Sequence, residues 1–197
     1  MSTETAQAFF SLLALLAGAG TILLLVLALL TRLGNEGAAT LGRAISDAGV
    51  WLAFVVALTA TLGSLYFSEI ADFVPCRLCW FQRIAMYPLA PILFVGAIRR
   101  DPNVRWYAAP IAATGVLIAG YHYLIEWRPE LDTGTCELFG PSCTAVWFRE
   151  FGFVTLAFMA LVGFVTILAL LFVRFPATLD RDGAQPPTAP SKQEVAP

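Results

Sequence analysis

The chain has 197 residues, of which 58% are hydrophobic and 13% charged, and its formal net charge is -2. Soluble domains carry charge on about a quarter of their residues, so this composition predicts a membrane protein, and the length suits one compact bundle. The small negative charge argues against nucleic acid as a partner, since nucleic acid would require a concentrated basic face. Membrane lipid is therefore the first partner that we expect.

Five apolar runs follow one another along the chain, at residues 8–30, 50–67, 80–98, 106–125 and 151–173. Each run has roughly 18–23 residues, the length at which an α-helix crosses about 30 Å of hydrocarbon. The first run is too long for the apolar core of a secretory signal, and no basic residue precedes it, so we expect it to be retained. The sequence thus predicts an all-α membrane protein. Buried helices of a large soluble protein would look similar, but five runs leave this short chain too little polar surface.

The basic residues are divided unequally between the two sets of flanks that alternate along the chain. Eight of the 12 Lys and Arg residues lie at 31–49, at 99–105 and after residue 173, and four lie in the other flanks. Because the richer set is normally cytoplasmic, we expect an external N-terminus and a cytoplasmic C-terminus. The tail, residues 175–197, is rich in Pro, Asp and Gln, and we expect it to be a disordered cytoplasmic extension.

The four cysteines form two close pairs, and the first pair, Cys76 and Cys79, begins the third apolar run. Pro75 suits the start of a helix, where free backbone N–H groups and the helix dipole favour a thiolate. Arg83 lies one turn beyond Cys79 on the same helix face. An arginine inside a membrane span is costly without a partner, so it is a candidate functional residue. It could stabilise a thiolate, bind a cofactor carbonyl, or simply extend to the interface.

The second pair, Cys136 and Cys143, lies in a loop with Gly140 and Pro141 that we expect to be mobile and accessible. A mobile disulfide beside one at a helix terminus can exchange with it and with a docking partner. A zinc site and purely structural disulfides are the alternatives, although the external location favours oxidised thiols over metal. Haem attachment is excluded because Trp80 occupies the position that histidine would need.

The only histidine, His122, lies between Tyr121 and Tyr123 near the outer end of the fourth run. Its depth in the membrane should be similar to that of Arg83. It could be a residue of the interfacial aromatic belt, or a proton or hydrogen-bond partner of a redox cofactor.

Residues 76–83 resemble the Cys-x-x-Cys-x-x-Gln-Arg segment of the DsbB disulfide-formation proteins. Residues 84–88 look most like the shorter Gram-positive form, BdbC, and residues 121–126 are similar to the family's segment before its second external loop. The resemblance runs from about residue 50 to residue 173. It implies a four-helix transmembrane bundle in the bacterial cytoplasmic membrane that oxidises a DsbA-like thioredoxin-fold dithiol protein and reduces ubiquinone or menaquinone.

The resemblance also implies roles for individual residues. Cys79 would be the thiolate that faces the quinone, with Arg83 and His122 beside the quinone. Cys76 would exchange with the second pair. Within that pair, Cys136 would form the mixed disulfide with the partner, and Cys143 would pass the bridge to Cys76.

Two features depart from the family pattern. The chain has an additional N-terminal span, so we expect residues 1–49 to add a helix and a cytoplasmic loop to a redox bundle at 50–174. The spacing of the second cysteine pair is also shorter than in Gram-negative enzymes. Vitamin-K-epoxide-reductase-like enzymes also use two cysteine pairs and a quinone, but their loop pair precedes the Cys-x-x-Cys. A non-catalytic scaffold with structural disulfides would give no reason for Arg83.

Overall fold

A computed structural model describes residues 2–132 and 141–175. The helices are α1 (Thr3–Arg32), α2 (Glu36–Asp47), α3 (Gly49–Glu69), α4 (Arg77–Arg99), α5 (Val104–Trp127), the short 3-10 helix η1 (Pro129–Leu131) and α6 (Leu156–Phe172). Within the described residues, the only β pairing is an isolated bridge. Four helices, α1, α3, α4 and α5, are long and apolar enough to cross a membrane, and α6 is apolar but has 17 residues. The predicted all-α membrane bundle is confirmed.

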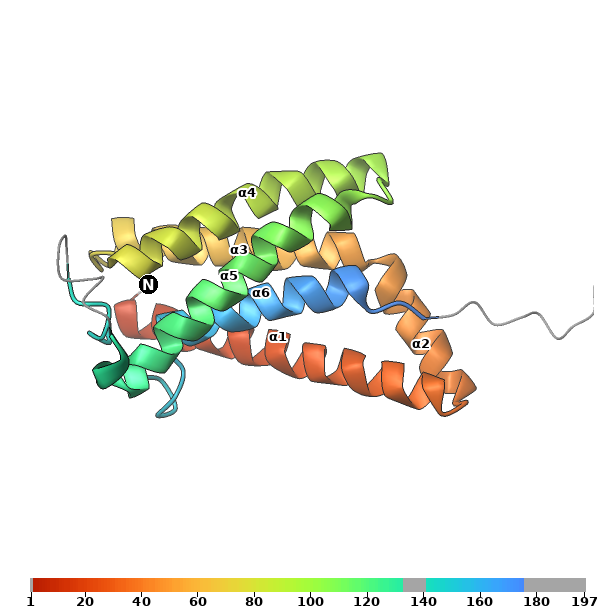
Figure 1. The fold of residues 1–197 in the computed structure, drawn as a ribbon, viewed down its shortest axis with the longest axis horizontal. Coiled ribbons are helices and arrows are strands. Elements are labelled where there is room, and N and C mark those ends of the chain that lie inside the picture. The colour runs from red at the N-terminus through yellow and green to blue at the C-terminus, as the bar shows by residue number, and fades with distance from the viewer. Residues whose placement is uncertain (1, 133–140, 176–197) are drawn as a thin grey trace, which may run out of the picture.

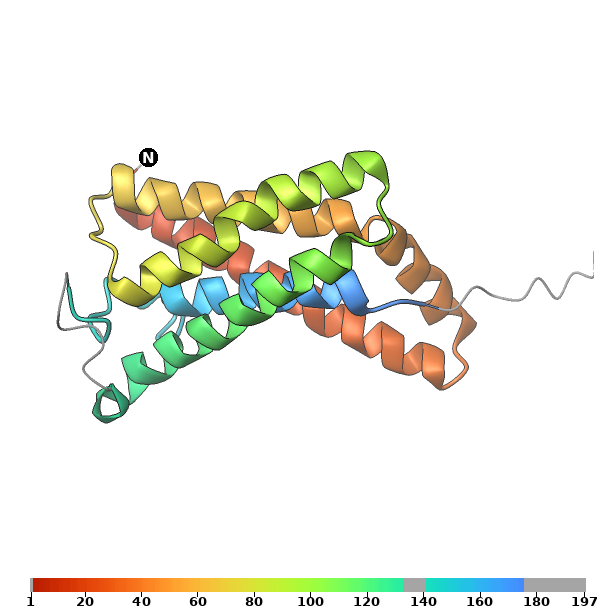
Figure 2. The ribbon, with the colours of Figure 1, turned by 45° about the horizontal axis from the view of Figure 1, so that its top comes forward.

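Helix α6 lies in the middle of the molecule, where it packs against α1, α3 and α5, while α4 packs against α3 and α5 (Figures 1 and 2). Large apolar side chains fill the centre, and Leu89, Leu93, Phe164 and Ile167 are fully buried there. Gly115 lets the Phe164 ring lie directly on the α5 backbone. The additional N-terminal helix is therefore part of the packed bundle.

Two segments differ from the predicted elements. The predicted cytoplasmic loop at 31–49 contains α2, whose first turn is capped by the Asn35 side chain accepting from the Ala38 N–H at 2.9 Å. The last helix begins at Leu156 and not at residue 151, because Phe151 and Gly152 have positive φ angles and Thr155 is the N-cap. The predicted tail lies outside the described residues, apart from Phe175.

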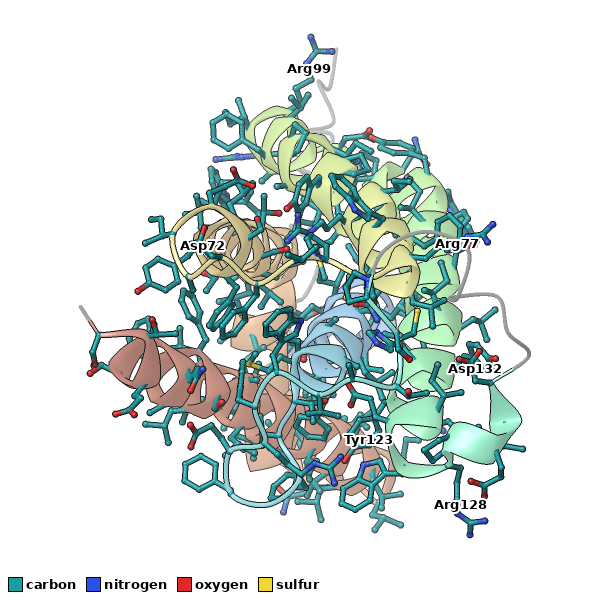
Figure 3. The ribbon with its side chains drawn as sticks, turned by 90° about the vertical axis from the view of Figure 1, so that its left-hand side faces the viewer. Asp72, Arg77, Arg99, Tyr123, Arg128 and Asp132 are labelled. Atoms are coloured by element: carbon teal, nitrogen blue, oxygen red, sulfur yellow. The ribbon has the colours of Figure 1, made fainter. Side chains whose placement is uncertain are left out.

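The two ends of the bundle differ in what they hold. The N-terminus, the α3–α4 connection and the segment between α5 and α6 share one end, and α2 lies at the other (Figure 1). Figure 3 looks onto the first of these ends, where Asp72 and Asp132 lie on connecting segments and Arg77 begins α4. The three described cysteines, Cys76, Cys79 and Cys143, and the C-terminal end of α5 are at this end, which we call the cysteine end.

Candidate redox site

The first cysteine pair is built around the start of α4. Cys76 is the N-cap of this helix, and its sulfur accepts from the Cys79 backbone N–H at 3.3 Å. The two sulfurs are 2.8 Å apart, and both cysteines are free. The side chain caps the first turn in the way that an Asp or Ser oxygen usually does, so the helix terminus itself holds the sulfur in place.

Cys76 is the sulfur at which thiolate-stabilising groups converge. The hydrogen bond from the Cys79 thiol, helped by His122 and opposed by burial, lowers the pKa of Cys76 to about 4. The helix N-terminus adds a favourable partial positive charge at the same position. The family resemblance implies Cys79 as the thiolate that faces the quinone, and this role stays a prediction; in the structure, the backbone N–H of Cys79 and the Nε2 atom of His122 both lie at the Cys76 sulfur.

His122, on α5, connects the thiol pair to the second loop. Its Nε2 atom lies 3.7 Å from the Cys76 sulfur and 3.2 Å from the carbonyl oxygen of Cys143. On the other side of the ring, Nδ1 is 3.1 Å from the amide nitrogen of Gln82. Since that amide nitrogen donates, Nδ1 accepts, and the ring proton is on Nε2, facing the sulfur and the carbonyl.

A buried carboxyl group continues this line of polar side chains. Glu126 lies one turn beyond His122, with Oε1 4.0 Å from the histidine Nε2. The Thr155 hydroxyl donates to the other carboxyl oxygen at 2.6 Å. His122 and Glu126 are only 3% and 8% exposed. Intramembrane acids are rare and usually functional, so Glu126 joins the candidate site.

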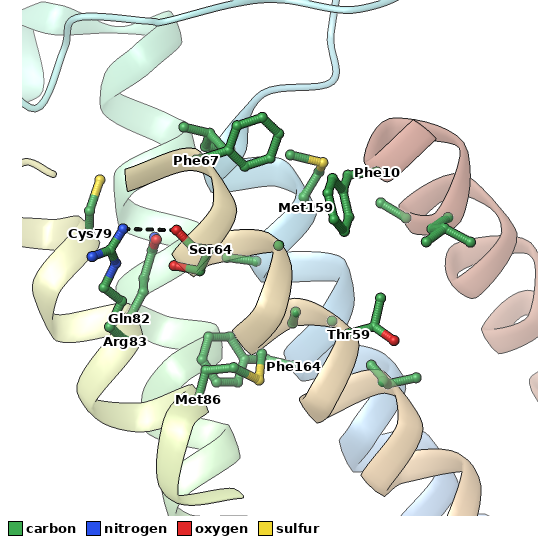
Figure 4. Close-up of a pocket in the computed structure, with 18 of the residues that line it drawn as sticks. Phe10, Thr59, Ser64, Phe67, Cys79, Gln82, Arg83, Met86, Met159 and Phe164 are labelled. Atoms are coloured by element: carbon green, nitrogen blue, oxygen red, sulfur yellow. Dashed lines mark hydrogen bonds between the residues drawn. The ribbon is translucent and has the colours of Figure 1, made fainter. Parts of the chain in front are cut away.

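Cys79 and Arg83 lie on the wall of a cavity of about 290 Å³ on the other side of the pair (Figure 4). Arg83 donates to the backbone oxygen of Ser64 at 3.1 Å, and its guanidinium lies over the Trp80 ring, 5.3 Å from the centroid. The cavity is polar near this arginine, and its remaining walls, from α1, α3 and α6, are mainly apolar. Its volume is near the lower end of the range for small-molecule sites, about 300–1,000 Å³.

The predicted site residues are therefore divided between two surroundings. Cys79 and Arg83 share the cavity, whereas His122 does not line it and contacts Cys76 instead. Cys136 lies outside the described residues. Cys143 is disulfide-bonded. It is fully buried, whereas the sequence predicts that it is accessible. The loop folds back onto the helix ends, where Cys143 packs with Cys76, Leu78 and Ile125.

Gln82, Glu126 and Thr155 are not among the site residues predicted from the sequence. Glu126 could have been found, because it follows His122 by four residues, which places the two side chains on one helix face. Thr155 could not, because only the folding of the last loop brings it to α5.

Cys76, Cys79 and His122 also bring three possible ligand atoms within 4.8 Å of one another. A structural zinc site takes four such ligands, so the structure provides three of the four that the alternative of a zinc site requires. The prediction that the site holds no metal stays a prediction, and a metal analysis of the purified protein would test it.

The chain is similar in sequence to proteins of disulfide bond formation. Residues 46–174 match the model of the family described as disulfide bond formation protein DsbB. "Probable disulfide formation protein C" of Halalkalibacterium halodurans is 46% identical over 128 residues, which cover 64% of this chain and 91% of the relative. "Disulfide bond formation protein C" of Bacillus subtilis is 42% identical over 122 residues, covering 62% and 88%.

No solved structure matches the chain. The family match covers α3, α4, α5, η1 and α6 but not α1 or most of α2, and it includes the four cysteines, Arg83 and His122. It also decides against the vitamin-K-epoxide-reductase-like alternative. The chain belongs to the DsbB family of disulfide bond formation proteins, and it is a multi-pass membrane protein with an oxidoreductase role in disulfide bond formation.

Proposed function

We propose that the chain is a thiol:quinone oxidoreductase that reoxidises a DsbA-like thioredoxin-fold dithiol protein and passes the electrons to a membrane quinone. The observation that carries this proposal is the different surroundings of two adjacent sulfurs. Cys76 faces His122 and the loop of Cys143, and Cys79 faces the cavity that contains Arg83. One pair can therefore exchange on one side and deliver electrons on the other.

The cavity fits a quinone by its chemistry. Arg83 has five N–H donors, and its bond to Ser64 uses one, so others can hold a carbonyl oxygen. The apolar walls from α3 and α6 suit a ring and an isoprenoid tail, and the residues present suit ubiquinone and menaquinone equally. When bound, the quinone supplies an acceptor for two electrons and two protons.

The proposed relay begins with thiol–disulfide exchange in the loop. A partner thiolate attacks Cys136, and resolution of the mixed disulfide oxidises the partner and leaves Cys136 and Cys143 as thiols. Cys143 then attacks the Cys76–Cys79 bridge at Cys76, which releases Cys79 as a thiolate. Cys136 attacks Cys143 and restores the loop disulfide, with Cys76 as the leaving group. The low pKa of Cys76 favours that last step, since a more acidic thiol leaves faster.

In the second half, the Cys76 and Cys79 thiols form their disulfide and give up two electrons and two protons. Cys79 is the sulfur on the cavity wall, and Arg83 supplies a fixed donor where negative charge develops. His122 holds a proton on Nε2 toward Cys76, and Gln82 keeps that tautomer. His122 and Gln82 therefore position the thiol pair, while Cys79 and Arg83 face the electron acceptor.

We also propose that the protein lies in the cytoplasmic membrane of a bacterial-type cell with its cysteine end outside. Residues 50–174 form the redox bundle, to which residues 1–49 add α1 and α2. The distribution of basic residues supports this orientation, because Arg99, Arg100 and Arg105 lie at the end of α4 and the start of α5, away from the cysteines.

The test is to mix purified protein with a reduced thioredoxin-fold dithiol protein and a quinone. We expect two partner thiols to disappear for each quinone that is reduced. The Cys76→Ser protein should reduce no quinone and oxidise at most one equivalent of partner, because its loop disulfide cannot be restored. Oxidation of the partner without quinone reduction would refute the assignment of a quinone as acceptor, and no oxidation of any dithiol would favour a structural role.

A further inference from the structure

Helix α1 lies outside the part of the chain that matches the DsbB family, residues 46–174, yet specific contacts fix it to the redox bundle. The Thr21 hydroxyl donates to that of Thr166 on α6 at 2.8 Å, and the pair is buried. Nearer the cysteine end, Ser11 is fully buried, with its hydroxyl 4.0 Å from the Met159 sulfur. These polar contacts lie within apolar surroundings, so they fix both the position of α1 along α6 and the face that α1 turns toward α6.

A second anchor connects α1 to α3 near the cysteine end. The Phe10 ring packs against Phe67, with the ring centroids 5.6 Å apart. Gly63 makes this approach possible, because a Cβ at this position would lie only 2.9 Å from the Phe10 ring. Away from this contact α1 packs on α6 and leaves space toward α3, as Figure 4 shows.

That space is continuous with the proposed quinone site, since the same cavity that holds Cys79 and Arg83 reaches α1. The residues that α1 contributes to the wall are Phe10, Leu13, Ala14 and Ala17. Two of these four are alanines three residues apart, so they share a helix face and leave room where larger side chains would fill it. The other sides of this extension come from α3 and α6.

We propose that α1 forms one wall of the tail-binding part of the quinone site, so that the isoprenoid tail leaves the headgroup between α1, α3 and α6. This inference rests on the proposed function. The tail is the occupant because the charged and amide side chains of the cavity, Arg83 and Gln82, lie at the Cys79 end, where a headgroup fits, while every residue that α1 contributes is apolar and Thr59 is the polar side chain on the facing side of α3. Without α1, the same side of α3 and α6 would face lipid directly.

The test compares binding of two naphthoquinones, a menaquinone with an isoprenoid tail and tail-less menadione. Binding is measured by quenching of tryptophan fluorescence, because Trp147 lines the cavity. Ala14→Phe fills the extension from α1. Ala19→Phe is the matched control, since Ala19 is on the same helix but exposed and outside the cavity wall.

We expect Ala14→Phe to weaken menaquinone binding by about tenfold or more, because apolar contact area is lost, and to change menadione binding by less than about twofold. Ala19→Phe should change neither. A tailed quinone with a photoreactive group in its tail, bound to the unaltered protein, should label α1. The labelling experiment needs no substitution, so it tests the position of the tail even if Ala14→Phe disturbs folding.

Three results would overturn the inference: equal binding of both quinones to the unaltered protein, equal weakening of both by Ala14→Phe, or labelling confined to α3 and α6. The first of these would indicate that a lipid chain occupies the space beside α1. If the unaltered protein instead binds no quinone and reduces none, the proposed function itself has failed, and the role of α1 fails with it.

Discussion

Replacing His122 by alanine should raise the pKa of Cys76. In the structure the Nε2–H group of His122 faces the Cys76 sulfur at 3.7 Å, and His122 is the second of the groups that lower this pKa to about 4. A hydrogen bond to a charged group contributes about 1.5–3 kcal/mol, and one pKa unit corresponds to about 1.4 kcal/mol. The variant should therefore lose the Cys76 thiolate at a pH about 1–2 units higher than the reference protein.

The assay is the pH dependence of thiolate absorbance in a protein with Cys136 and Cys143 replaced by serine, so that only the first pair titrates. The thiolate should be present above the midpoint and lost below it, so His122→Ala loses it at a pH where the reference protein retains it. Tyr123→Phe is the control on the same helix, since its hydroxyl bonds to Phe153 and not to the pair. An unchanged midpoint in His122→Ala would refute the reasoning.

Four further predictions follow from the same geometry. Cys79→Ser should abolish quinone reduction in the coupled assay, and normal turnover would contradict the relay. Arg83→His should slow quinone reduction by about 10²–10³-fold at saturating dithiol. Arg83→Lys should recover only part of the rate, because lysine keeps the charge but lacks the planar guanidinium. If partner exchange slows while the dependence on quinone concentration is unchanged, Arg83 belongs to the exchange step. Glu126→Gln should lower thermal stability less than Glu126→Leu, which leaves the Thr155 hydroxyl without its acceptor, and equal melting temperatures would refute this role. Reporter fusions after Arg105 and near the C-terminus should both read cytoplasmic, and an external signal from either would reverse the proposed orientation.

The sequence was sufficient for features that depend on local chemistry. Pro75 followed by the first cysteine predicts a helix start at the pair, and the structure has Cys76 as the N-cap of α4. The spacing of Cys79 and Arg83 predicts a shared helix face, and both residues line one cavity. Apolar runs of membrane length likewise predict α1, α3, α4 and α5, because a helix in lipid must satisfy its own backbone hydrogen bonds.

Features that depend on contacts between segments distant in the chain could not be predicted from the sequence. The second loop looks polar and flexible, yet Cys143 is fully buried, because burial depends on how the loop folds onto Leu78 and Ile125. The start of α6 was also misplaced by five residues, since the positive φ angle at Phe151 reflects a turn that no apolar pattern encodes. The start of α2 could have been predicted from Asn35, a residue type that often caps helices, but the helix has only 12 residues and its amphipathic pattern is short.

The position of His122 relates the two cysteine pairs to one another. Its Nε2–H is one donor facing the Cys76 sulfur, the Cys143 carbonyl and, at 4.0 Å, the Glu126 carboxyl. A thiolate is a much stronger acceptor than a disulfide sulfur, so a reduced Cys76 should attract this hydrogen bond and an oxidised Cys76 should release it. In the proposed relay, the released donor would bond to the carbonyl of Cys143 and hold this cysteine beside Cys76 while Cys143 attacks the Cys76–Cys79 disulfide. Gln82 supports this exchange of partners, because its amide donates to Nδ1 and so favours the tautomer with the ring proton on the side that faces both cysteines.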